Sequence, residues 1–396
     1  MKTIFTLAPA VSASSNQRFC VFSHFDSQGH LARYVLHYLR ELKQLNYEII
    51  FVSTSHALPE QGIEQLEQLC HTVCLRENVG YDFGSYKAGI QLIRESGFRP
   101  TSLLLANDSV FGPILPLANA WDPEIMRDYD LYGMTDSFDH GYHLQSYFLA
   151  FSQRLLESDD FHDFWDSVEN KASLQSDFKT SIILDYEVGG TKNFLLKGYK
   201  IGVRFPFEDI LAKRVEKLAS QLRQLKTVSN YGDELDVRNL QLNLNASHRY
   251  WDTLLDMGFP FIKRELLTKN PTFAAIDSWP QAVSSRGHFD ATMIVETLIE
   301  MDAIQSIYQI DPTNSIAQLR SPGDVMECEL NSIFHANASA LGLSLKARFM
   351  FDDAYYLRNN PDVKMVVQEG GLPDGLTHFK AHGLREGRVH RFNRQL

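Results

Sequence analysis

The feature that most constrains the fold is a regular alternation of strand-like and helix-like segments between residues 19 and 108. Apolar residues run almost unbroken through the strand-like segments, whereas Leu31, Val35, Leu39 and Leu42 recur at the spacing of a helix that buries one face. Because parallel strands need a crossover between them, this alternation predicts an α/β fold with a mostly parallel, Rossmann-like sheet flanked by helices. The predicted strands are 19–25, 47–54, 72–78 and 102–108, and the predicted helices are 31–45, 62–70 and 83–96.

The chain beyond residue 108 extends this pattern and then changes character. Two more strands, a helix that ends near Gly198 with a strand after it, and a long charged helix at 208–226 are predicted. The predicted domains are a flexible N-terminal tail at 1–18, a main α/β domain at 19–275, a helical region at 276–345 and a small helical accessory module at 346–396.

Composition and charge exclude several classes of protein. No apolar run approaches the roughly 20 residues that span a bilayer, and a formal charge of −11 gives no general attraction to nucleic acid. Cys20, Cys70, Cys74 and Cys328 are too few and too scattered for a disulfide framework. We therefore expect packed thiols, a reducing compartment and a cytoplasmic protein that binds no nucleic acid.

Three predicted strands are each followed by an acidic residue: Asp26, Asp82 and Asp108. In a parallel sheet, ligands bind beyond the carboxyl ends of the strands, where the strand order reverses. Each acid also has a structural interpretation, since Asp26 suits a turn, Asp82 suits a helix cap and Asp108 suits a turn before Pro113. For one acid alone the structural interpretation is favoured, but for three at neighbouring strand ends we favour a ligand site.

Two longer segments resemble parts of inverting glycosyltransferases with the glycosyltransferase A fold. Residues 76–109, RENVGYDFGSYKAGIQLIRESGFRPTSLLLANDS, are similar to their nucleotide-sugar-binding half, in which an apolar strand ends in an acidic motif, usually Asp-x-Asp. Residues 186–201, YEVGGTKNFLLKGYKI, are similar to their later helix, in which an acidic residue lies eleven positions before a Gly-Tyr pair. Glu187 and Gly198 have that separation.

Five motifs in order resemble one family more narrowly, the rhamnan synthesis protein F family of bacterial polysaccharide glycosyltransferases. They extend over about residues 19–272 and read SHFDSQG, ENVGYDFGSYKAG, LLLANDSVFGP, HLQSYFLAF and PFIKRELLTKNP. Residues 351–388 resemble a helical module found in bacterial surface-polysaccharide glycosyltransferases and exported repeat proteins, and no chemistry is assigned to them.

The resemblance implies a glycosyltransferase that places L-rhamnose from dTDP-L-rhamnose on a lipid-linked surface polysaccharide or O-antigen. The rhamnose comes from the family name alone. The partners implied are a nucleotide sugar and a glycan acceptor, with peripheral association at the inner face of the cell membrane. Residues 19–275 would then be the catalytic domain.

The resemblance also assigns roles to single residues. Glu187 is the expected general base, with the alternative that it is an exposed acid in the first turn of its helix. Asp108 is the expected ligand of a divalent cation, Mg²⁺ or Mn²⁺, that holds the donor diphosphate. Ser109 and Val110 stand where many relatives of the fold carry a further Asp, so the alternative is that Asp108 hydrogen-bonds the ribose or the sugar. The predicted donor-binding set is His24, Phe25, Asp26, Asn78, Gly80, Asp82, Asp108, Ser109, His143 and Gln145.

Two other functions compete with glycosyl transfer. The acids and histidine of SHFD, GYD and ND superficially resemble the ligands of a metal-dependent phosphoesterase, although only His24 is placed as such a site requires. A non-catalytic sugar-binding scaffold would keep the fold without turnover. For Phe25 a core position is an alternative to stacking on a nucleobase, and for His143 a loop position is an alternative to ligand contact.

Overall fold

The computed structural model describes residues 2–6, 17–168, 181–224, 245–272, 274–301, 350–383, 386, 388–389 and 392–393. The chain divides into two compact units, one made of residues 1–205 and 245–308 and the other of residues 206–244 and 309–396. The predicted domain borders stay predictions. Of the predicted helical region 276–345, residues 302–345 lie outside the described part of the chain.

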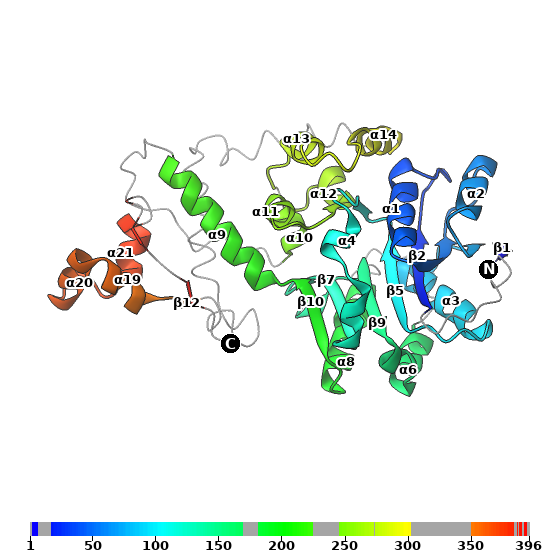
Figure 1. The fold of residues 1–396 in the computed structure, drawn as a ribbon, viewed down its shortest axis with the longest axis horizontal. Coiled ribbons are helices and arrows are strands. Elements are labelled where there is room, and N and C mark those ends of the chain that lie inside the picture. The colour runs from blue at the N-terminus through cyan, green and yellow to red at the C-terminus, as the bar shows by residue number, and fades with distance from the viewer. Residues whose placement is uncertain are drawn as a thin grey trace. The chain divides into compact units, whose positions relative to one another are not determined.

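The first unit is built on one large sheet, and the four strands predicted between residues 19 and 108 are confirmed (Figure 1). They are β2 (Arg18–His24), β3 (Tyr47–Ser53), β4 (Thr72–Leu75) and β5 (Ser102–Asn107). The sheet also contains β1 (Lys2–Thr6), β7 (Leu131–Ser137), β9 (Phe148–Ser152) and β10 (Ile201–Phe205). The strand order is β1-β4-β3-β2-β5-β9-β7-β10, and the short strand β8 (His143–Leu144) pairs with β7.

The sheet is mostly parallel, as the alternation predicted. Strand β2 pairs in parallel with β3 and β5, and β3–β4 and β7–β10 are also parallel pairs. Strand β9 is antiparallel to both of its neighbours, β5 and β7. The fold class is therefore α/β with a mixed sheet.

Helices α1 (Arg33–Gln44) and α3 (Tyr81–Glu95) cover opposite faces of this sheet. Successive side chains of a strand point to opposite faces. Val21 belongs to the core that contains Tyr86 and Ile90 of α3, whereas the neighbouring Phe22 packs edge-on against Tyr38 of α1, with ring centroids 5.3 Å apart. Helix α2 (Glu60–Glu67) lies between β3 and β4 in the chain, as predicted.

Two glycines fix the position of α3. Gly80 precedes the helix with φ of 78°, in the left-handed region that favours glycine. A Cβ atom on Gly89 would lie only 2.4 Å from Cγ1 of Val21, so the glycine lets the helix approach β2 closely. This close contact sets where the first turn of α3, with Asp82, meets the edge of the sheet.

The remaining helices of the first unit follow the predicted order. The predicted helix near 181–198 is present as a π-helical turn, η2 (Ile183–Val188), which continues into α8 (Gly189–Leu196) and then leads to β10. Among the other helices are α4 (Leu117–Ala120), η1 (Pro123–Arg127), α5 (Gln153–Leu156), α6 (Asp159–Ser167), α10 (Ala246–Arg249), α11 (Trp251–Asp256), α12 (Arg264–Thr268), α13 (Trp279–Ser284) and α14 (Thr292–Glu300).

A two-stranded ribbon joins distant parts of the first unit. Strand β6 (Val110–Phe111) directly follows the end of β5, and it pairs antiparallel with β11 (Ile262–Lys263). The pairing brings together segments about 150 residues apart in the chain, next to the carboxyl end of β5.

The prediction of a flexible tail over residues 1–18 is wrong for Lys2–Thr6, because these residues form β1. This strand pairs antiparallel with β4, with Lys2 opposite Leu75. The pairing satisfies backbone groups of β4 that an edge strand would leave to solvent. Residues 7–16 of the predicted tail lie outside the described chain.

In the second unit, the predicted long charged helix is α9 (Phe207–Gln224). The predicted C-terminal helices are α19 (Asp353–Asn359), α20 (Pro361–Gln368), α21 (Gly375–His378) and η4 (Phe379–Gly383). Strands β12 (Met350–Phe351) and β13 (Phe392–Asn393) pair beside them. Asp362 and Arg388 form an ion pair, with Oδ2 and Nη2 2.6 Å apart, so these charges hold the module together internally.

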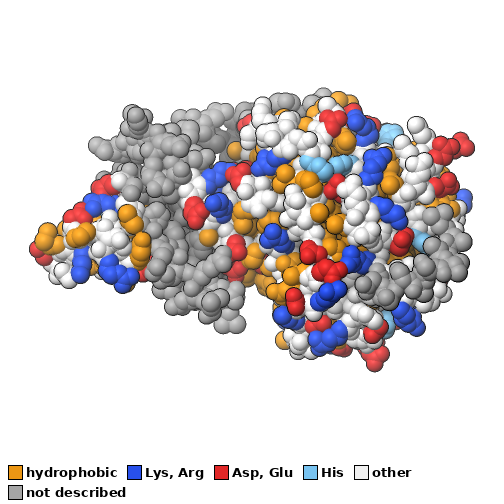
Figure 2. All heavy atoms as spheres, in the orientation of Figure 1, with side chains coloured by type: hydrophobic (Ala, Val, Ile, Leu, Met, Phe, Trp, Pro, Cys, Tyr) orange, Lys and Arg blue, Asp and Glu red, His pale blue; other side chains and the backbone are white. Residues whose placement is uncertain are grey.

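Three features that were considered from the composition can be examined in the described residues: membrane-spanning helices, the distribution of charge and the cysteines. Across the described segments, no helix is both long and apolar enough to cross a membrane. Basic and acidic side chains are interspersed on the face shown in Figure 2. Cys20, Cys70 and Cys74 are free and buried, and burial raises the pKa of the Cys70 thiol, which keeps it protonated and unreactive. Cys328 lies outside the described residues.

Candidate active site at the carboxyl edge of the sheet

The strand order reverses between β2 and β5. From β2 the chain builds β3 and β4 on one side, and it then crosses over so that β5 pairs with the other side of β2. The carboxyl ends of β2 and β5 therefore flank a switch point, the position where α/β sheets bind ligands.

Asp82 lies at this switch point and not in its own helix cap. Its Oδ1 accepts a hydrogen bond of 2.9 Å from the hydroxyl of Ser23, at the end of β2. Its Oδ2 accepts one of 3.0 Å from the amide of Asn107, at the end of β5. Burial, followed by the charge of Asp108, raises the pKa of Asp82 to about 6. The carboxyl group thus titrates close to neutral pH.

Asp108 lies beside it, in an ion pair with a residue from far along the chain. Oδ2 of Asp108 is 3.3 Å from Nη1 of Arg264 and accepts a 3.1 Å hydrogen bond from the backbone N–H of Phe25. The Asp108 side chain is only 6% exposed and that of Arg264 is 22% exposed, so the pair is largely removed from water. The hydroxyl of Tyr34, on α1, donates to the backbone oxygen of Asp108 and accepts from Arg264.

The β6–β11 ribbon is what brings Arg264 to Asp108. Lys263 pairs with Val110, and the backbone N–H of Arg264 donates to the backbone oxygen of Ser109 at 2.8 Å. Arg264 therefore lies opposite the end of β5. The sequence analysis assigned it no role, although its segment, PFIKRELLTKNP, is one of the five family motifs.

Lys263 extends the basic edge of the site toward β9. Its ammonium group lies 3.8 Å from the centre of the Tyr147 ring, a cation–π contact. Tyr147 is fully buried and its hydroxyl group lies 2.6 Å from that of Thr135. Two consecutive cations thus line the site, one at Asp108 and one at Tyr147.

Glu187 lies in the π-helical turn η2 and faces the segment before β9. Its Oε1 accepts a hydrogen bond of 2.5 Å from the backbone N–H of Ser146. The hydroxyl of Thr191, one turn later, donates to the backbone oxygen of Glu187 and accepts from the N–H of Leu144. Glu187 is half-buried and held in place, unlike a freely exposed acid in the first turn of a helix. Single π-turns inside helices are frequent at functional sites.

Helix α3 connects the Asp108 corner with Glu187. Asp82 is in the first turn of the helix, and one turn later the hydroxyl of Tyr86 donates to the backbone oxygen of Ser146. The Phe83 ring lies 5.6 Å from that of Tyr186, next to Glu187. Helix α3 and Ser146 therefore connect Asp82 with Glu187 within the first unit.

Comparison with known sequences identifies the family. The sequence model of the family described as "Rhamnan synthesis protein F" matches residues 49–219. The "Virulence protein VirA" of Vibrio anguillarum is 30% identical over 236 residues, which cover 58% of this chain and 73% of that protein. The chain belongs to the rhamnan synthesis protein F family.

Three further similarities were found. The "Uncharacterized protein y4gN" of Sinorhizobium fredii is 31% identical over 199 residues, which cover 49% of either chain. Among solved structures, a putative nucleotide-diphospho-sugar transferase of Desulfovibrio desulfuricans G20 aligns over 47% of this chain and 79% of its own at 12% identity, with a TM-score of 0.29. The glycosyltransferase GlyE of Streptococcus pneumoniae TIGR4 aligns over 73% and 64% at 11% identity, with a TM-score of 0.32.

The other family-derived residues lie at varying distances from this centre. His24 is buried with Nδ1 3.0 Å from the hydroxyl of Ser53, and burial lowers its pKa, so the imidazole is neutral at pH 7. Phe25 is 40% exposed, which removes the core alternative for its side chain. Oδ1 of Asp26 accepts from the N–H groups of Gln28 and His30, which is the turn role weighed for it.

The remaining predicted positions also take definite places. Ser109 donates from its hydroxyl, at 2.6 Å, and from its backbone N–H to Oδ1 of Asn107. Nδ1 of His143 is 2.8 Å from the backbone oxygen of Gly141, and Oε1 of Gln145 accepts from Thr135. Asn78 is exposed in the turn that leads to Gly80.

A group of potential metal ligands lies in another part of the first unit. Among the residues that the structure describes, one group of three or more His, Cys, Asp or Glu side chains could hold a metal ion: His37, Glu41 and His288. Asp108 is not part of such a group.

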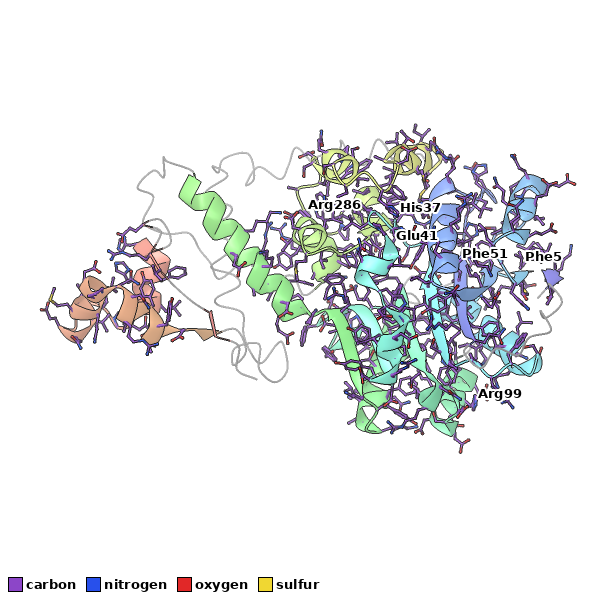
Figure 3. The ribbon with its side chains drawn as sticks, viewed as in Figure 1. Phe5, His37, Glu41, Phe51, Arg99 and Arg286 are labelled. Atoms are coloured by element: carbon purple, nitrogen blue, oxygen red, sulfur yellow. The ribbon has the colours of Figure 1, made fainter. Side chains whose placement is uncertain are left out.

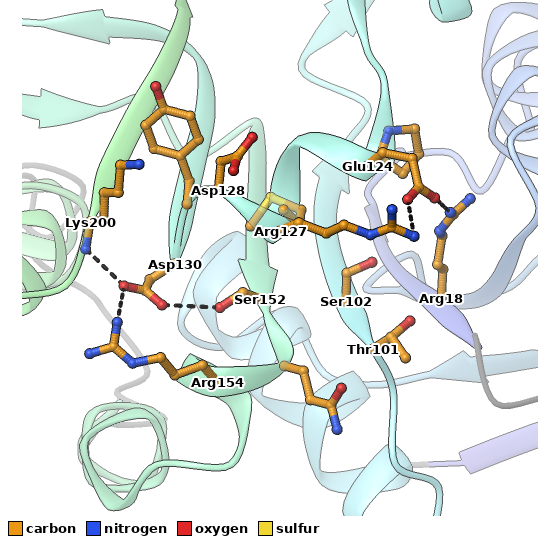
Figure 4. Close-up of a pocket in the computed structure, with 14 residues that line it drawn as sticks. Arg18, Thr101, Ser102, Glu124, Arg127, Asp128, Asp130, Ser152, Arg154 and Lys200 are labelled. Carbon is orange, nitrogen blue, oxygen red and sulfur yellow. Dashed lines mark hydrogen bonds and ion pairs between the residues drawn. The ribbon is translucent and has the colours of Figure 1, made fainter.

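A separate cavity of about 390 Å³ lies at the opposite edge of the sheet, where β2 and β5 begin (Figure 4). Several of its charges are paired with each other: Arg18 with Glu124, and Arg154 with Asp130 at 2.8 Å between Nη1 and Oδ2. Asp130 also accepts from the backbone N–H of Lys200. These contacts stabilise the edge of the sheet at which β2 and β5 begin. The cavity contains none of the family-derived site residues.

Proposed function

We propose that the chain transfers a sugar from a nucleotide-sugar donor to a glycan acceptor at the Asp108–Glu187 region. The observation that carries the proposal is the Arg264–Asp108 ion pair at the switch point, flanked by Asp82 and Lys263. In this family of glycosyltransferases the chemical need is to stabilise a leaving diphosphate while an acceptor hydroxyl loses its proton.

Arg264 and Lys263 are the groups proposed to stabilise the leaving diphosphate. An anionic ligand needs a local positive charge in a chain of net charge −11, and these two cations are adjacent on the same edge. A guanidinium group binds phosphate oxygens through two parallel N–H bonds, and a lysine adds a point charge. Asp108 then orients Arg264 through the 3.3 Å ion pair, and it leaves the other guanidinium nitrogens for the donor.

The surroundings of Asp108 do not fit a metal held by the protein, which departs from the sequence-based expectation. Its Oδ2 already accepts from Arg264 and Phe25, and both oxygens of the neighbouring Asp82 are engaged by Ser23 and Asn107. A cation here would also meet the fixed positive charge of Arg264. The proposed reaction therefore has no step that requires a divalent cation.

Glu187 is the proposed general base. Ser146 fixes one carboxylate oxygen with a 2.5 Å hydrogen bond, and within the described segments Oε2 has no hydrogen-bond partner. In the proposed step the acceptor oxygen attacks the anomeric carbon, the bond from that carbon to the diphosphate oxygen breaks, and Glu187 takes the hydroxyl proton. A single displacement of this kind inverts the anomeric centre.

Phe25 and Gly80 are proposed to complete the donor pocket. The 40% exposed ring of Phe25 offers a face for stacking on a nucleobase, and its backbone N–H is bound to Asp108. The left-handed Gly80 lets a ligand approach the backbone at the start of α3. We propose dTDP-L-rhamnose as donor and a lipid-linked bacterial surface polysaccharide or O-antigen as acceptor, on the basis of the family description.

The experiment is a thermal-unfolding screen with a panel of nucleotide sugars, followed by a transfer assay with the donors that bind. The expected result is a donor-specific rise in Tm, largest for dTDP-L-rhamnose. Glu187→Gln should keep this rise and abolish transfer, whereas Arg264→Met should lose both. Glu157→Gln and Arg99→Met, at exposed positions, are the matched controls and should behave like the wild type.

Three outcomes would contradict the proposal. Absence of protection by every nucleotide sugar would favour a different ligand, and an active Glu187→Gln enzyme would remove this residue as the base. Release of phosphate from a simple ester, unchanged in both variants, would favour the phosphoesterase. An increase in transfer rate on adding Mg²⁺ or Mn²⁺ to protein in metal-buffered solution would refute the metal-independent role of Arg264.

A further inference from the structure

Three potential metal ligands lie together on the α1 side of the first unit, and none of them is among the residues assigned to glycosyl transfer. His37 and Glu41 are four residues apart on α1 and so share one face of the helix, and Figure 3 labels both. His288 comes from the segment between α13 and α14. One ligand atom from each residue lies within 4.8 Å of the other two.

The contact between His288 and Glu41 is not an ordinary hydrogen bond. Nε2 of His288 is 3.2 Å from Oε1 of Glu41, yet it is buried and has no hydrogen-bond partner among the described residues. Two ligands of a tetrahedral zinc ion, each about 2.0–2.1 Å from the metal, are roughly 3.3 Å apart. The two atoms therefore have the separation of neighbouring metal ligands without the alignment of a donor and an acceptor.

The other atoms of the cluster are held as the outer contacts of metal ligands usually are. Nε2 of His37 is 2.9 Å from the backbone oxygen of Pro113, which fixes the proton there and leaves the Nδ1 lone pair. Oε2 of Glu41 accepts a 2.8 Å hydrogen bond from the backbone N–H of Leu117. Such second contacts to a backbone carbonyl or N–H fix the tautomer and the orientation of ligating side chains.

A histidine–glutamate ion pair alone does not account for this cluster. It would need only one histidine, whereas the rings of His37 and His288 are 5.4 Å apart and would repel each other if both were protonated.

We propose that His37, Glu41 and His288 bind a zinc-class divalent cation, with a fourth position open to water. Two imidazoles and one carboxylate form a ligand set typical of zinc. The His288 side chain is 27% exposed as a whole, although its Nε2 atom is buried.

The bound ion would fasten the segment that carries His288 and α14 to α1. Arg33 of α1 already holds this segment through ion pairs to Asp290, at 3.3 Å, and Glu296, at 2.8 Å. These pairs are exposed and contribute little by themselves. Tyr34, the next residue of α1, donates to the backbone oxygen of Asp108. The proposed metal site therefore lies beside the proposed donor-binding residues without including any of them.

The test uses the untagged full chain, stripped with EDTA and desalted. Titration with Co²⁺ should produce the visible absorption bands of a tetrahedral site with one equivalent bound, and Zn²⁺ should remove them. Zn²⁺ should also raise the Tm by several degrees. His288→Ala and Glu41→Gln should lose the bands and the Tm shift, while His140→Ala, at an exposed histidine, should keep both.

The proposal is overturned if the wild type gives no Co²⁺ bands, or if the bands survive in His288→Ala. His288 lies in a connecting segment and is partly exposed, so its removal should leave the fold intact, and circular dichroism checks this. If Glu41→Gln does not fold, the Co²⁺ spectrum of His37→Ala replaces it and should likewise lack the bands. Protection by nucleotide sugars is measured separately, so failure of the zinc site leaves the glycosyltransferase proposal untouched.

Discussion

Replacing Asp82 by Asn should remove the contribution of this carboxyl group to the pH dependence of the unfolding free energy. Burial and the charge of Asp108 raise the pKa of Asp82 to about 6, compared with about 3.9 in an unfolded chain. The folded protein thus binds this proton more tightly than the unfolded one. Stability from this group is present below about pH 4 and is lost as the pH rises through about 6.

The magnitude follows from the size of the shift. About 2 pH units at about 1.4 kcal/mol each give about 3 kcal/mol, and the partial exposure of Asp82 reduces this to about 1–3 kcal/mol. An amide at this position can still accept from Asn107 and donate to Ser23, so the neutral variant loses only the acceptor for the serine hydroxyl, about 1 kcal/mol. Asp82→Asn should be slightly less stable than wild type at pH 4 and equal or more stable at pH 7.

The assay is urea unfolding of both proteins from pH 4 to pH 7, followed by tryptophan fluorescence. Trp165 stacks on Phe83, with ring centroids 5.9 Å apart, so its emission reports the environment of α3. The difference in unfolding free energy between the two proteins cancels the titrations that they share. Asp128→Asn, at an exposed acid, is the control and should give a flat difference. The unfolding free energy of Asp82→Asn minus that of the wild type should rise between pH 4 and pH 7. A difference that stays flat or falls over this range would refute the raised pKa.

Three further changes test other parts of the structure. Gly89→Ala should lower the unfolding free energy by about 1–3 kcal/mol, because the new Cβ would lie 2.4 Å from Val21; an unchanged urea midpoint would contradict the close packing of α3. Asp130→Ala should lower it by about 2–4 kcal/mol, since Arg154 and the N–H of Lys200 lose their acceptor, and Asp128→Ala should not. Tyr34→Phe removes only the hydroxyl that links Arg264 to the Asp108 backbone, so donor protection in the Tm screen should weaken; full protection would show that this link is dispensable.

Local pattern was enough to predict the strands and helices between residues 19 and 108. Strands β2 and β5 are buried along almost their whole length, so they appear in the sequence as continuous apolar runs. The apolar stripe of α1 has the helical period because only one face of the helix is buried. Strand β1 was missed because its partner β4 lies about 70 residues away in the chain, and the short segment Lys2–Thr6 has no local pattern that predicts this pairing.

The site was predicted in part for the same reason. Asp82 and Asp108 follow strands, and parallel strands bring their carboxyl ends to one edge, so their proximity could be anticipated. Asp26 also follows a strand, but the local hydrogen bonds of its own turn determine its orientation.

The sequence by itself determined the α/β class, the strand ends that carry the acids and the family motifs. The tertiary structure alone decided that Arg264 meets Asp108 and that His288 meets Glu41. The first contact joins residues 156 positions apart and depends on the pairing of β6 with β11. The second depends on the docking of α14 against α1. Side-chain periodicity extends over a few residues, whereas such contacts depend on how whole elements pack, so no local pattern encodes them.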